Sequence, residues 1–291
     1  MKKCIKSILP SVLLPYIRLV NNLFFRGKTI SLRKINFLKN KDTLIVLGNG
    51  PSLDNDIEYI NSLKSDADFI CVNNFACSEL YEKFQPNKYL FMDDYFFSNN
   101  AHLDWVNQRK KTYESINNKT TWKLQILLPS QAEVDIVKSQ ISNKNVEFIK
   151  FNTAGYVNGS LKASFFHFNT GFFGPFQGNV LIYAIYLGIW CRYKCIKVFG
   201  ADLSMHENVK VDQSTNDLYM TFKHFNNSEK RERFLKNPDK IEPFKMHEFL
   251  LLSAETFFAH QVLDKYAESK NVDIYNCSNY SLIDAYKRGK N

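Results

Sequence analysis

Short apolar runs alternate with amphipathic stretches from residue 43 to the end of the chain. Such alternation predicts a parallel sheet covered by helices. We therefore expect an α/β fold, a single Rossmann-like domain with a mostly parallel sheet and helices on both faces. The runs predict six or seven strands, at 43–47, 68–72, 88–92, 124–128, 146–150, 196–199 and 272–275. Helices are predicted at 54–64, 76–84, 131–142, 178–192 and 247–270.

Two longer stretches have weak periodicity. Residues 151–177 are rich in Asn and Phe, and residues 204–246 are polar and charged. Long loops in compact domains are usually functional or mobile, so we predict a lid-like insertion at about 204–246. The predicted organisation is a basic N-terminal segment, 1–42, followed by one domain, 43–291.

The net charge of +9 is confined to the N-terminal segment. The other 249 residues carry 28 basic and 28 acidic side chains. A neutral body argues against a nucleic-acid partner. With 45% hydrophobic residues in 291, the chain is long enough to bury a core, and no apolar run is long enough to span a membrane. The first 42 residues contain one acid, Asp42, and ten basic residues: Lys2, Lys3, Lys6, Arg18, Arg26, Lys28, Arg33, Lys34, Lys39 and Lys41.

The N-terminal segment combines these charges with aliphatic side chains. Pro15 can occupy the first turn of a helix that runs to about Phe25, with Leu14, Ile17 and Leu19 on one surface. We predict peripheral contact with an anionic membrane surface. The same residues would also suit packing on the domain or on another subunit, so a homo-oligomer stays open. A secretory signal would have a longer unbroken apolar core.

The six cysteines include no CxxC pair and lie mostly in apolar runs. A chain of this size needs no disulfide framework, and we expect reduced cysteines and a cytoplasmic location.

The strongest local motif is the turn Gly48-Asn49-Gly50-Pro51-Ser52, between the first predicted strand and a helix. Glycines permit close backbone approach, and the N–H groups of a helix start attract anions. We predict that this turn binds a nucleotide phosphate; the alternative is a plain strand-to-helix turn. Leu53 stands where a dinucleotide-binding GxGxxG motif has its third glycine, which disfavours a dehydrogenase.

Polar groups also follow three other predicted strands. These are Asn73 and Asn74, Asp93 and Asp94, and Asp202. Ligands of open α/β sheets bind at this edge, where an Asn can read a base or a ribose. Asp93, Asp94 and Asp202 are candidate ligands for Mg²⁺ or Mn²⁺ at a diphosphate, and helix caps are the alternative for the first two.

Taken in order, these motifs resemble the bacterial sialyltransferases of glycosyltransferase family 42 and the related MptE-like proteins. The latter include pterin diphosphokinases and proteins of surface-polysaccharide clusters. The resemblance implies a GT-A-variant-like fold over about 43–288. It is carried by Gly48–Ser52, Asn73-Asn74-Phe75, Gly178, Leu187-Gly188 and Gly200-Ala201-Asp202.

The resemblance also implies roles for individual residues. Asn49 corresponds to an Asn that contacts the donor's phosphate and ribose, Asn73 to a nucleotide-contacting Asn, and His247 to a histidine general base. Asp93 stands where the family has another Asn, which leaves room for a metal-assisted diphosphate donor. Further candidates are Gln177, Gly178 and Asn179 near the family's phosphate contact, Tyr219 for its tyrosines, and Ser278 for nucleotide binding.

A histidine suits the removal of a proton from an acceptor hydroxyl, because its pKa lies near neutrality. His206, four residues after Asp202, is the alternative base. The expected activity is inverting transfer from a nucleotide-sugar donor, a CMP-linked sialic acid or related acidic sugar, to a glycan or lipid-linked acceptor at the inner face of the cytoplasmic membrane. The alternatives are a Mg-dependent diphosphokinase and a non-catalytic partner in polysaccharide assembly.

Overall fold

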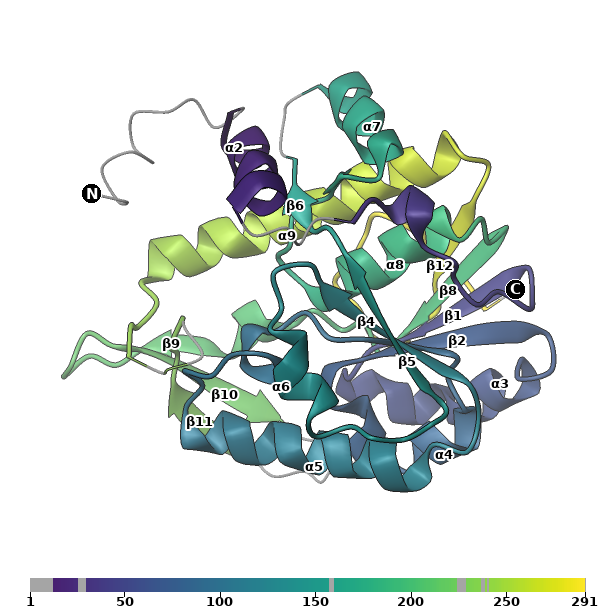
Figure 1. Ribbon diagram of the computed structural model, residues 1–291. Helices are drawn as coiled ribbons and strands as arrows, with labels where there is room; N and C mark the ends of the chain where they lie inside the picture. Colours follow the sequence, from purple (N-terminus) through teal and green to yellow (C-terminus); the bar gives the residue numbers. More distant parts are fainter. Residues whose placement is uncertain are drawn as a thin grey trace.

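The computed structural model describes residues 13–25, 30–156, 160–223, 229–236, 239 and 241–290. Within them, one eight-stranded sheet has the order β13-β12-β8-β1-β2-β3-β4-β5, and all neighbouring strands are parallel (Figure 1). The direction of winding reverses between β1 and β8. The strands are β1 Thr43–Leu47, β2 Ala67–Val72, β3 Lys88–Leu90, β4 Leu124–Pro129, β5 Val146–Phe151, β8 Cys195–Phe199, β12 Asp273–Asn276 and β13 Lys287–Arg288.

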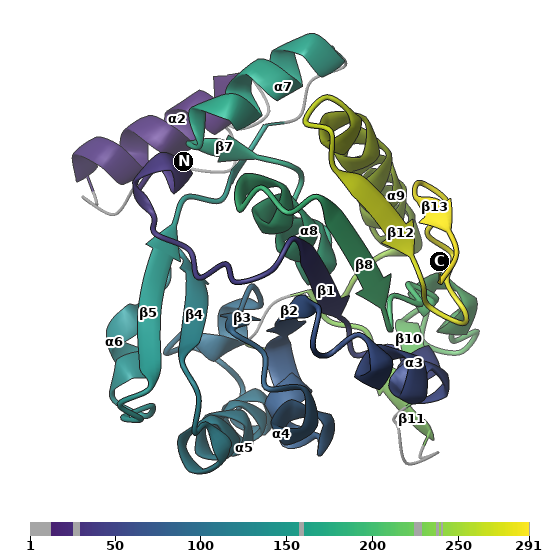
Figure 2. The same cartoon turned by 90° about the vertical axis from the view of Figure 1, so that its right-hand side faces the viewer.

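Helices cover both faces of this sheet (Figures 1 and 2). Leu44 and Val46 of β1 face the core beneath α8 and α9, whereas Ile45 and Leu47 face the core beneath α3 to α6. This two-residue alternation is the expected period of a strand buried on both sides. The helices are α2 Leu14–Val20, α3 Ile57–Ser62, α4 Leu80–Phe84, α5 Leu103–Lys119, α6 Val134–Lys138, α7 Leu161–Thr170, α8 Val180–Trp190 and α9 Met246–Glu268.

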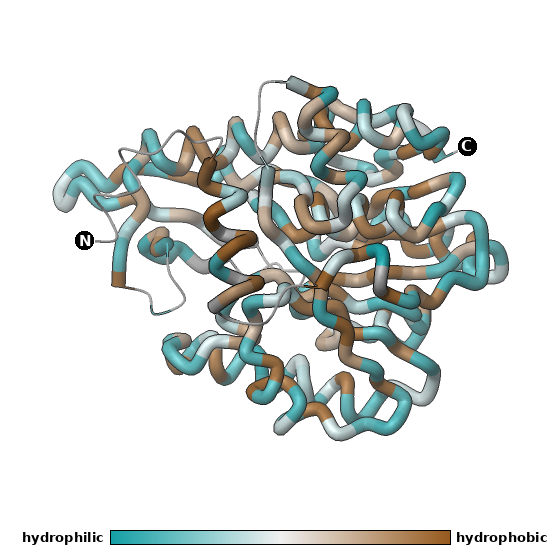
Figure 3. The backbone as a smooth tube through the Cα atoms, turned by 45° about the horizontal axis from the view of Figure 1, so that its top comes forward, coloured by the Kyte–Doolittle hydropathy of each residue, from teal (hydrophilic) through white to brown (hydrophobic). Residues whose placement is uncertain are grey.

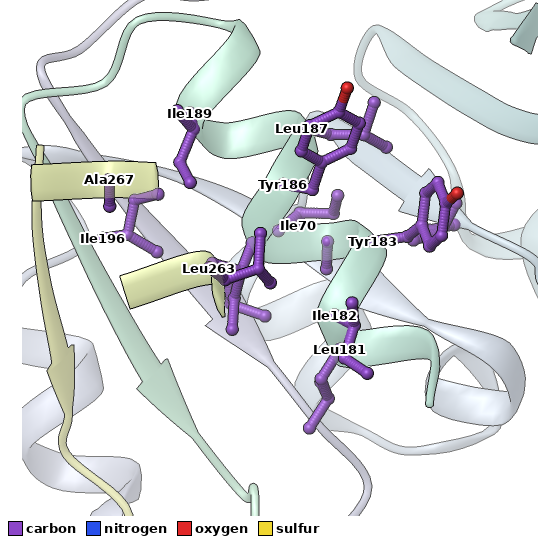
Figure 4. Packing of buried hydrophobic residues seen from close by; sticks show 14 of the residues in the cluster. Ile70, Leu181, Ile182, Tyr183, Tyr186, Leu187, Ile189, Ile196, Leu263 and Ala267 are labelled. Carbon is purple, nitrogen blue, oxygen red and sulfur yellow. The ribbon is translucent and has the colours of Figure 1, made fainter. Parts of the chain in front are cut away.

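Helix α8 is the centre of the larger core. Its residues 181–189 are all buried, and a helix that is apolar on every side is expected in the interior. Figure 4 shows Leu263 of α9 beside Ile196 of β8, next to the side chains of α8 that belong to the same cluster. The contact between α8 and α9 therefore holds the long C-terminal helix on the sheet.

The predicted fold class is confirmed, and all seven predicted strands are present within two residues of their expected ends. The predicted helix boundaries are less accurate. The stretch 54–64 divides into a 3-10 helix, Pro51–Asp56, and α3, and the stretch 131–142 is helical only over α6.

Two helices were not predicted, α5 and α7. The buried face of α5 carries the polar residues Arg109 and Thr112 beside Tyr113 and Ile116, so its apolar stripe is interrupted. The Arg109 guanidinium donates to the carbonyls of Tyr95 and Ser98 at 2.8 and 2.7 Å, which compensates its burial. Helix α7 has an aromatic rather than periodic sequence, although Ser160 caps its start.

The predicted insertion at 204–246 is built around a small antiparallel sheet of β9 Val209–Val211, β10 Leu218–Lys223 and β11 Glu229–Arg233. Leu218 and Met220 of β10 are buried against Phe249 of α9. The apolar alternation of Leu218, Met220 and Phe222 is short and lies within a polar stretch, so it did not indicate a strand. This sheet and the first turn of α9 therefore form one packed unit.

The N-terminal segment packs on the domain by one face. Pro15 lies in the first turn of α2, as predicted, and α2 continues into a π-helical turn over Asn21–Phe25. The hydroxyl of Tyr16 lies 2.5 Å from Nε2 of His167 in α7, and its ring contacts Tyr156. None of the helices in the described part of the chain is both long and apolar enough to cross a bilayer. The basic residues of 1–12 lie outside the described residues, as does Cys4.

Cys71, Cys191 and Cys277 are buried and free of disulfides. Cys77 is exposed and Cys195 is half-buried. Burial, which is expected for cysteines in apolar runs, therefore holds for three of the five described cysteines.

Candidate functional site

The turn after β1 is joined to the loop after β8 by a row of hydrogen bonds. The Gly48 and Gly50 amides donate to the carbonyls of Phe199 and Gly200, both at 2.9 Å. The Ser52 amide donates to Oδ2 of Asp202 at 3.0 Å, and the Ser52 hydroxyl also bonds this carboxylate. The crevice expected at the reversal between β1 and β8 is therefore closed by the protein's own groups.

This contact explains why the turn contains glycines. A Cβ on Gly48 would lie 2.3 Å from the carbonyl oxygen of Gly200, and a Cβ on Gly50 would lie 2.3 Å from Oδ1 of Asp202. Gly200 has a φ of +61°, a conformation that disfavours other residues. The glycines are thus required for the approach of the two loops, whatever ligand binds nearby.

The interpretation of this turn as a phosphate cradle is therefore wrong for the amides of Gly50 and Ser52. Their hydrogens are already bonded within the chain, and Pro51 has no N–H. The Asn49 amide is the remaining donor of the turn, since it has no hydrogen-bond partner among the described residues. Burial raises the pKa of Asp202, although the hydrogen bonds from Ser52 oppose the shift.

Asn49, Asn73 and Asp93 follow the ends of β1, β2 and β3. Nδ2 of Asn49 donates to the carbonyl of Val72 at 3.1 Å, and Nδ2 of Asn73 donates to Oδ2 of Asp93 at 2.8 Å. Asn73 has a left-handed backbone with φ of +49°. The structure therefore links polar groups that follow three neighbouring strands, β1, β2 and β3.

Asn73 also carries an unsatisfied acceptor. Its Oδ1 is buried and has no hydrogen-bond partner among the residues that the structure describes. A buried acceptor without a partner is costly, so native structures usually provide one. Since Nδ2 faces a carboxylate, the two ends of this amide cannot exchange. A ligand hydroxyl or amino group would supply the missing donor.

Asp93 and Asp94 are both accessible to solvent at the end of β3. The protein around Asp93 nevertheless displaces much of the water, and this effect, followed by repulsion from Asp94, raises the pKa of Asp93 to about 6. Loss of water also raises the pKa of Asp94. Asp93 is the cap residue of a 3-10 helix, Asp94–Phe96, but its side chain makes no capping bond. The capping alternative is therefore wrong for this carboxylate.

The predicted metal set of Asp93, Asp94 and Asp202 is not assembled. Across the described ranges, no three His, Cys, Asp or Glu side chains are close enough together to hold a metal ion. Asp202 is instead held by Ser52. Asp93 and Asp94 would supply at most two protein ligands, so a diphosphate and water would have to complete a Mg²⁺ shell.

Several predicted binding residues have structural partners. Both ends of the Asn74 amide are bonded, to the Tyr95 hydroxyl at 2.8 Å and to Thr112 Oγ1 at 2.7 Å. Ser278 accepts from the Ala201 amide at 3.0 Å. The polar atoms of Asn74 and Ser278 thus hold neighbouring loops together. These contacts do not support a role of the two residues in ligand binding.

The same is true of residues 177–179. Gln177 donates to the carbonyl of Thr153, and Asn179 caps α8 by accepting from the Leu181 amide at 2.7 Å. A Cβ on Gly178 would lie 2.0 Å from Oγ1 of Thr256 in α9. These contacts position the start of α8 against α9. A phosphate-binding role for residues 177–179 stays a prediction.

His247 is exposed in the first turn of α9, beside the antiparallel sheet of the insertion (Figure 1). The turn is held by Glu248, which accepts from the Lys245 amide at 2.8 Å and pairs with Lys236 at 2.6 Å. Lys245, not His247, is the cap residue. His247 is therefore exposed on a turn that other residues hold in place, and its role as a general base stays a prediction.

The alternative base, His206, is also exposed, and its ring lies 5.8 Å from that of Phe257 in α9. Tyr219 lies in β10 with the Arg231 guanidinium 4.6 Å from its ring centre. Arg231 was missed by the sequence reasoning. Arg231 and Arg233, two positions apart in a polar stretch, are the signal that could have indicated basic residues on one face of a strand.

A structural comparison finds the MAf glycosyltransferase from Magnetospirillum magneticum AMB-1, with a TM-score of 0.46 and 10% identity. The match covers 88% of this chain and 35% of that chain, so the present chain spans about a third of that protein's length. No protein-family model and no curated protein sequence matches the chain. The resemblance to family 42 sialyltransferases stays a prediction.

Proposed function

We propose that this protein transfers a sugar from a nucleotide-activated donor, a CMP-linked sialic acid or related acidic sugar, to a surface-glycan acceptor. The observation that carries the proposal is the buried, unsatisfied Oδ1 of Asn73 at the sheet edge, beside Asn49 and Asp93. A ribose hydroxyl or the amino group of cytosine would satisfy this acceptor. The Asn49 amide would then face the donor phosphate.

The proposed reaction is a direct displacement. His247 takes the proton of the acceptor hydroxyl while its oxygen bonds to the anomeric carbon, and the bond from that carbon to the phosphate oxygen of CMP breaks. Attack opposite the leaving group inverts the anomeric configuration. Histidine suits this role because it exchanges a proton near neutral pH. The acceptor in this proposal is carried by a lipid at the inner face of the cytoplasmic membrane.

A second candidate is a Mg-dependent diphosphokinase. The adjacent carboxylates of Asp93 and Asp94 favour it, since Mg²⁺ is commonly held by one or two carboxylates together with substrate phosphates. In that case ATP with Mg²⁺, rather than CMP, would occupy the edge of the sheet.

Nucleotide-dependent thermal stabilisation separates these candidates. The full chain is heated with CMP, CDP, UDP, GDP, ADP or ATP, each with and without Mg²⁺ or Mn²⁺. A ligand at 100 times its Kd stabilises the folded state by about 2.7 kcal/mol. A shift with CMP alone supports the glycosyltransferase, and a shift only with ATP and metal supports the diphosphokinase. No shift with any nucleotide would leave the non-catalytic partner.

The choice of base is tested by two substitutions with the same chemistry. His247→Ala should abolish turnover and keep the CMP-dependent shift, whereas His206→Ala should keep both. Full turnover by His247→Ala would move the base to His206.

A further inference from the structure

The outer face of α2 is apolar where a soluble helix is usually polar. Leu13, Ile17, Val20 and Phe24 are 44, 46, 47 and 78% exposed, and their spacing places them on one side of the helix and the turn after it. In Figure 3 the tube over α2 is mostly brown, the colour of hydrophobic residues. Part of the apolar surface of this segment is therefore exposed, beside the face that packs on the domain.

Helix α2 is held on the domain by contacts across its inner face. Besides the bond to His167, the Tyr16 ring lies 5.3 Å from the ring of Phe173. The outer face cannot turn inward without breaking these contacts. It is therefore a fixed surface of the folded protein.

Two neighbouring helices of the domain, α7 and α9, also carry exposed aromatic side chains. Phe166 of α7, next to His167, is 68% exposed, and Phe258 of α9 is 54% exposed. Phe258 lines a largely apolar pocket with Phe168 of α7 and Phe176. Figures 1 and 2 show α2 and α7 on the same side of the molecule, opposite α5. We name this surface the apolar ridge; it consists of Leu13, Ile17, Val20, Phe24, Phe166 and Phe258.

Charge decides between the possible occupants of the ridge. Residues 1–41 contain ten Lys and Arg and no Asp or Glu, and the remaining body is neutral. A second copy seated on the ridge would bring two strongly basic segments together, which is repulsive. An anionic bilayer would attract the basic residues and accept the apolar side chains. We propose that the apolar ridge docks the folded protein onto an anionic membrane surface, through α2 together with α7 and α9.

Helix α9 connects the ridge to the candidate base. Phe258 and His247 lie on the same helix, eleven residues apart by number, which is about 17 Å along the axis. Docking through Phe258 would therefore hold His247 within reach of an acceptor carried by a membrane lipid. This last link rests on the proposed function, whereas the docking itself does not.

Vesicle co-sedimentation of the full chain tests the docking. The vesicles contain phosphatidylcholine alone or with about 30% phosphatidylglycerol, an anionic lipid. Ile17→Asp/Phe24→Asp removes part of the ridge on α2, and Phe166→Asp removes the part on α7. Leu103→Asp is the matched control, since Leu103 is 73% exposed at the start of α5 on the opposite side.

We expect the wild type and Leu103→Asp to bind the anionic vesicles, the double variant to bind at least about tenfold more weakly, and Phe166→Asp to bind more weakly than the control. Equal binding by the wild type and the double variant would overturn the proposal. So would a wild-type dimer, measured by light scattering, that the double substitution dissociates. A wild-type Tm and cooperative unfolding without any nucleotide show that the variants are folded. Vesicle binding without any nucleotide shift would refute the proposed function and leave the docking intact.

Discussion

At the scale of single residues, Asn73 combines a left-handed backbone, a bond to Asp93 and an unsatisfied acceptor. Asn73→Gly removes the side chain and keeps a residue that tolerates a positive φ. If Oδ1 receives a bond from the nucleotide, its loss should weaken nucleotide binding about tenfold, the equivalent of about 1.4 kcal/mol. Isothermal titration with the nucleotide that stabilises the wild type measures this change.

Asn271→Gly is the control for this substitution. Asn271 also has a positive φ, of +55°, and lies after α9, preceding β12. It should bind the nucleotide as the wild type does. Equal affinity for Asn73→Gly and Asn271→Gly would show that the unsatisfied oxygen has no part in binding.

The raised pKa of Asp93 gives a dependence of stability on pH. A carboxyl with a pKa of about 6 in the folded chain and 3.8 as its ordinary value favours the folded state only while protonated. Its contribution is complete below about pH 4 and disappears as the pH rises through about 6. Asp93→Asn should therefore raise the Tm relative to the wild type at pH 7.5 and lose this advantage at pH 4. Because Asp93 contacts solvent, the gain should be small.

Thermal unfolding of both proteins across this pH range measures the effect. A Tm difference that stays constant with pH would mean that the Asp93 carboxyl titrates near its ordinary pKa. Asp93→Asn keeps an acceptor for Nδ2 of Asn73, so the hydrogen bond itself is not the variable.

At the scale of elements, hydrogen bonds hold the turn after β1 and the loop after β8 together as one unit, which we call the joint. Gly48→Ala would place a Cβ 2.3 Å from a backbone oxygen that cannot rotate away. We expect a loss of about 1–3 kcal/mol in the free energy of unfolding, from strain between the two loops. Urea denaturation without any nucleotide measures it.

Gly155→Ala provides the comparison, because its Cβ would meet its nearest neighbour, the Pro175 carbonyl oxygen, at 3.2 Å. It should be less destabilised than Gly48→Ala. If Gly48→Ala kept wild-type stability and lost only nucleotide binding, the glycine would serve the ligand instead of the joint.

The same joint shows how far sequence reasoning reaches. The buried strands were predicted because their apolar residues are continuous, and the strand ends indicated which polar residues share one edge of the sheet. The pattern Gly48–Ser52 predicts a tight turn equally well with a phosphate or with Asp202 as its partner. That choice depends on a contact between residues 150 positions apart, which local spacing does not encode. Helix α5 was missed because polar residues interrupt its buried apolar face: Arg109 and Thr112 are buried beside Tyr113 and Ile116, and tertiary hydrogen bonds satisfy the Arg109 guanidinium.

At the scale of the whole molecule, the N-terminal segment is a structural part of the domain as well as the source of its net charge. Leu32 is 2% exposed, and its amide donates to the carbonyl of Gly171 at 3.0 Å. The Asn40 amide donates to Asp68 at 2.7 Å. The predicted boundary at 43 therefore cuts through contacts that fasten the segment to β2 and to the end of α7.

The most consequential of these contacts involves a buried lysine. Lys88 of β3 is 1% exposed, and its ammonium donates to the carbonyl of Leu38 and to the Tyr193 hydroxyl at 2.7 Å. Tyr193 in turn donates to Asp68 at 2.7 Å. Burial lowers the pKa of Lys88, because the charged ammonium loses its contact with water. The hydrogen bonds to Leu38 and Tyr193 stabilise the charged form. Removal of Leu38 would leave a buried ammonium with one acceptor fewer, at a cost of about 1–3 kcal/mol.

A chain of residues 43–291 should therefore unfold at a lower urea concentration than a chain of residues 30–291. The urea midpoint of the chain of 30–291 should lie closer to that of the full-length protein. Lys88→Met should reduce this difference, because a side chain without charge does not need the Leu38 carbonyl. Urea midpoints of the two chain lengths, each with Lys88 and with Met at this position, measure the coupling between the segment and the lysine. Equal midpoints for 43–291 and 30–291 would mean that residues 30–42 lie on the domain without stabilising it.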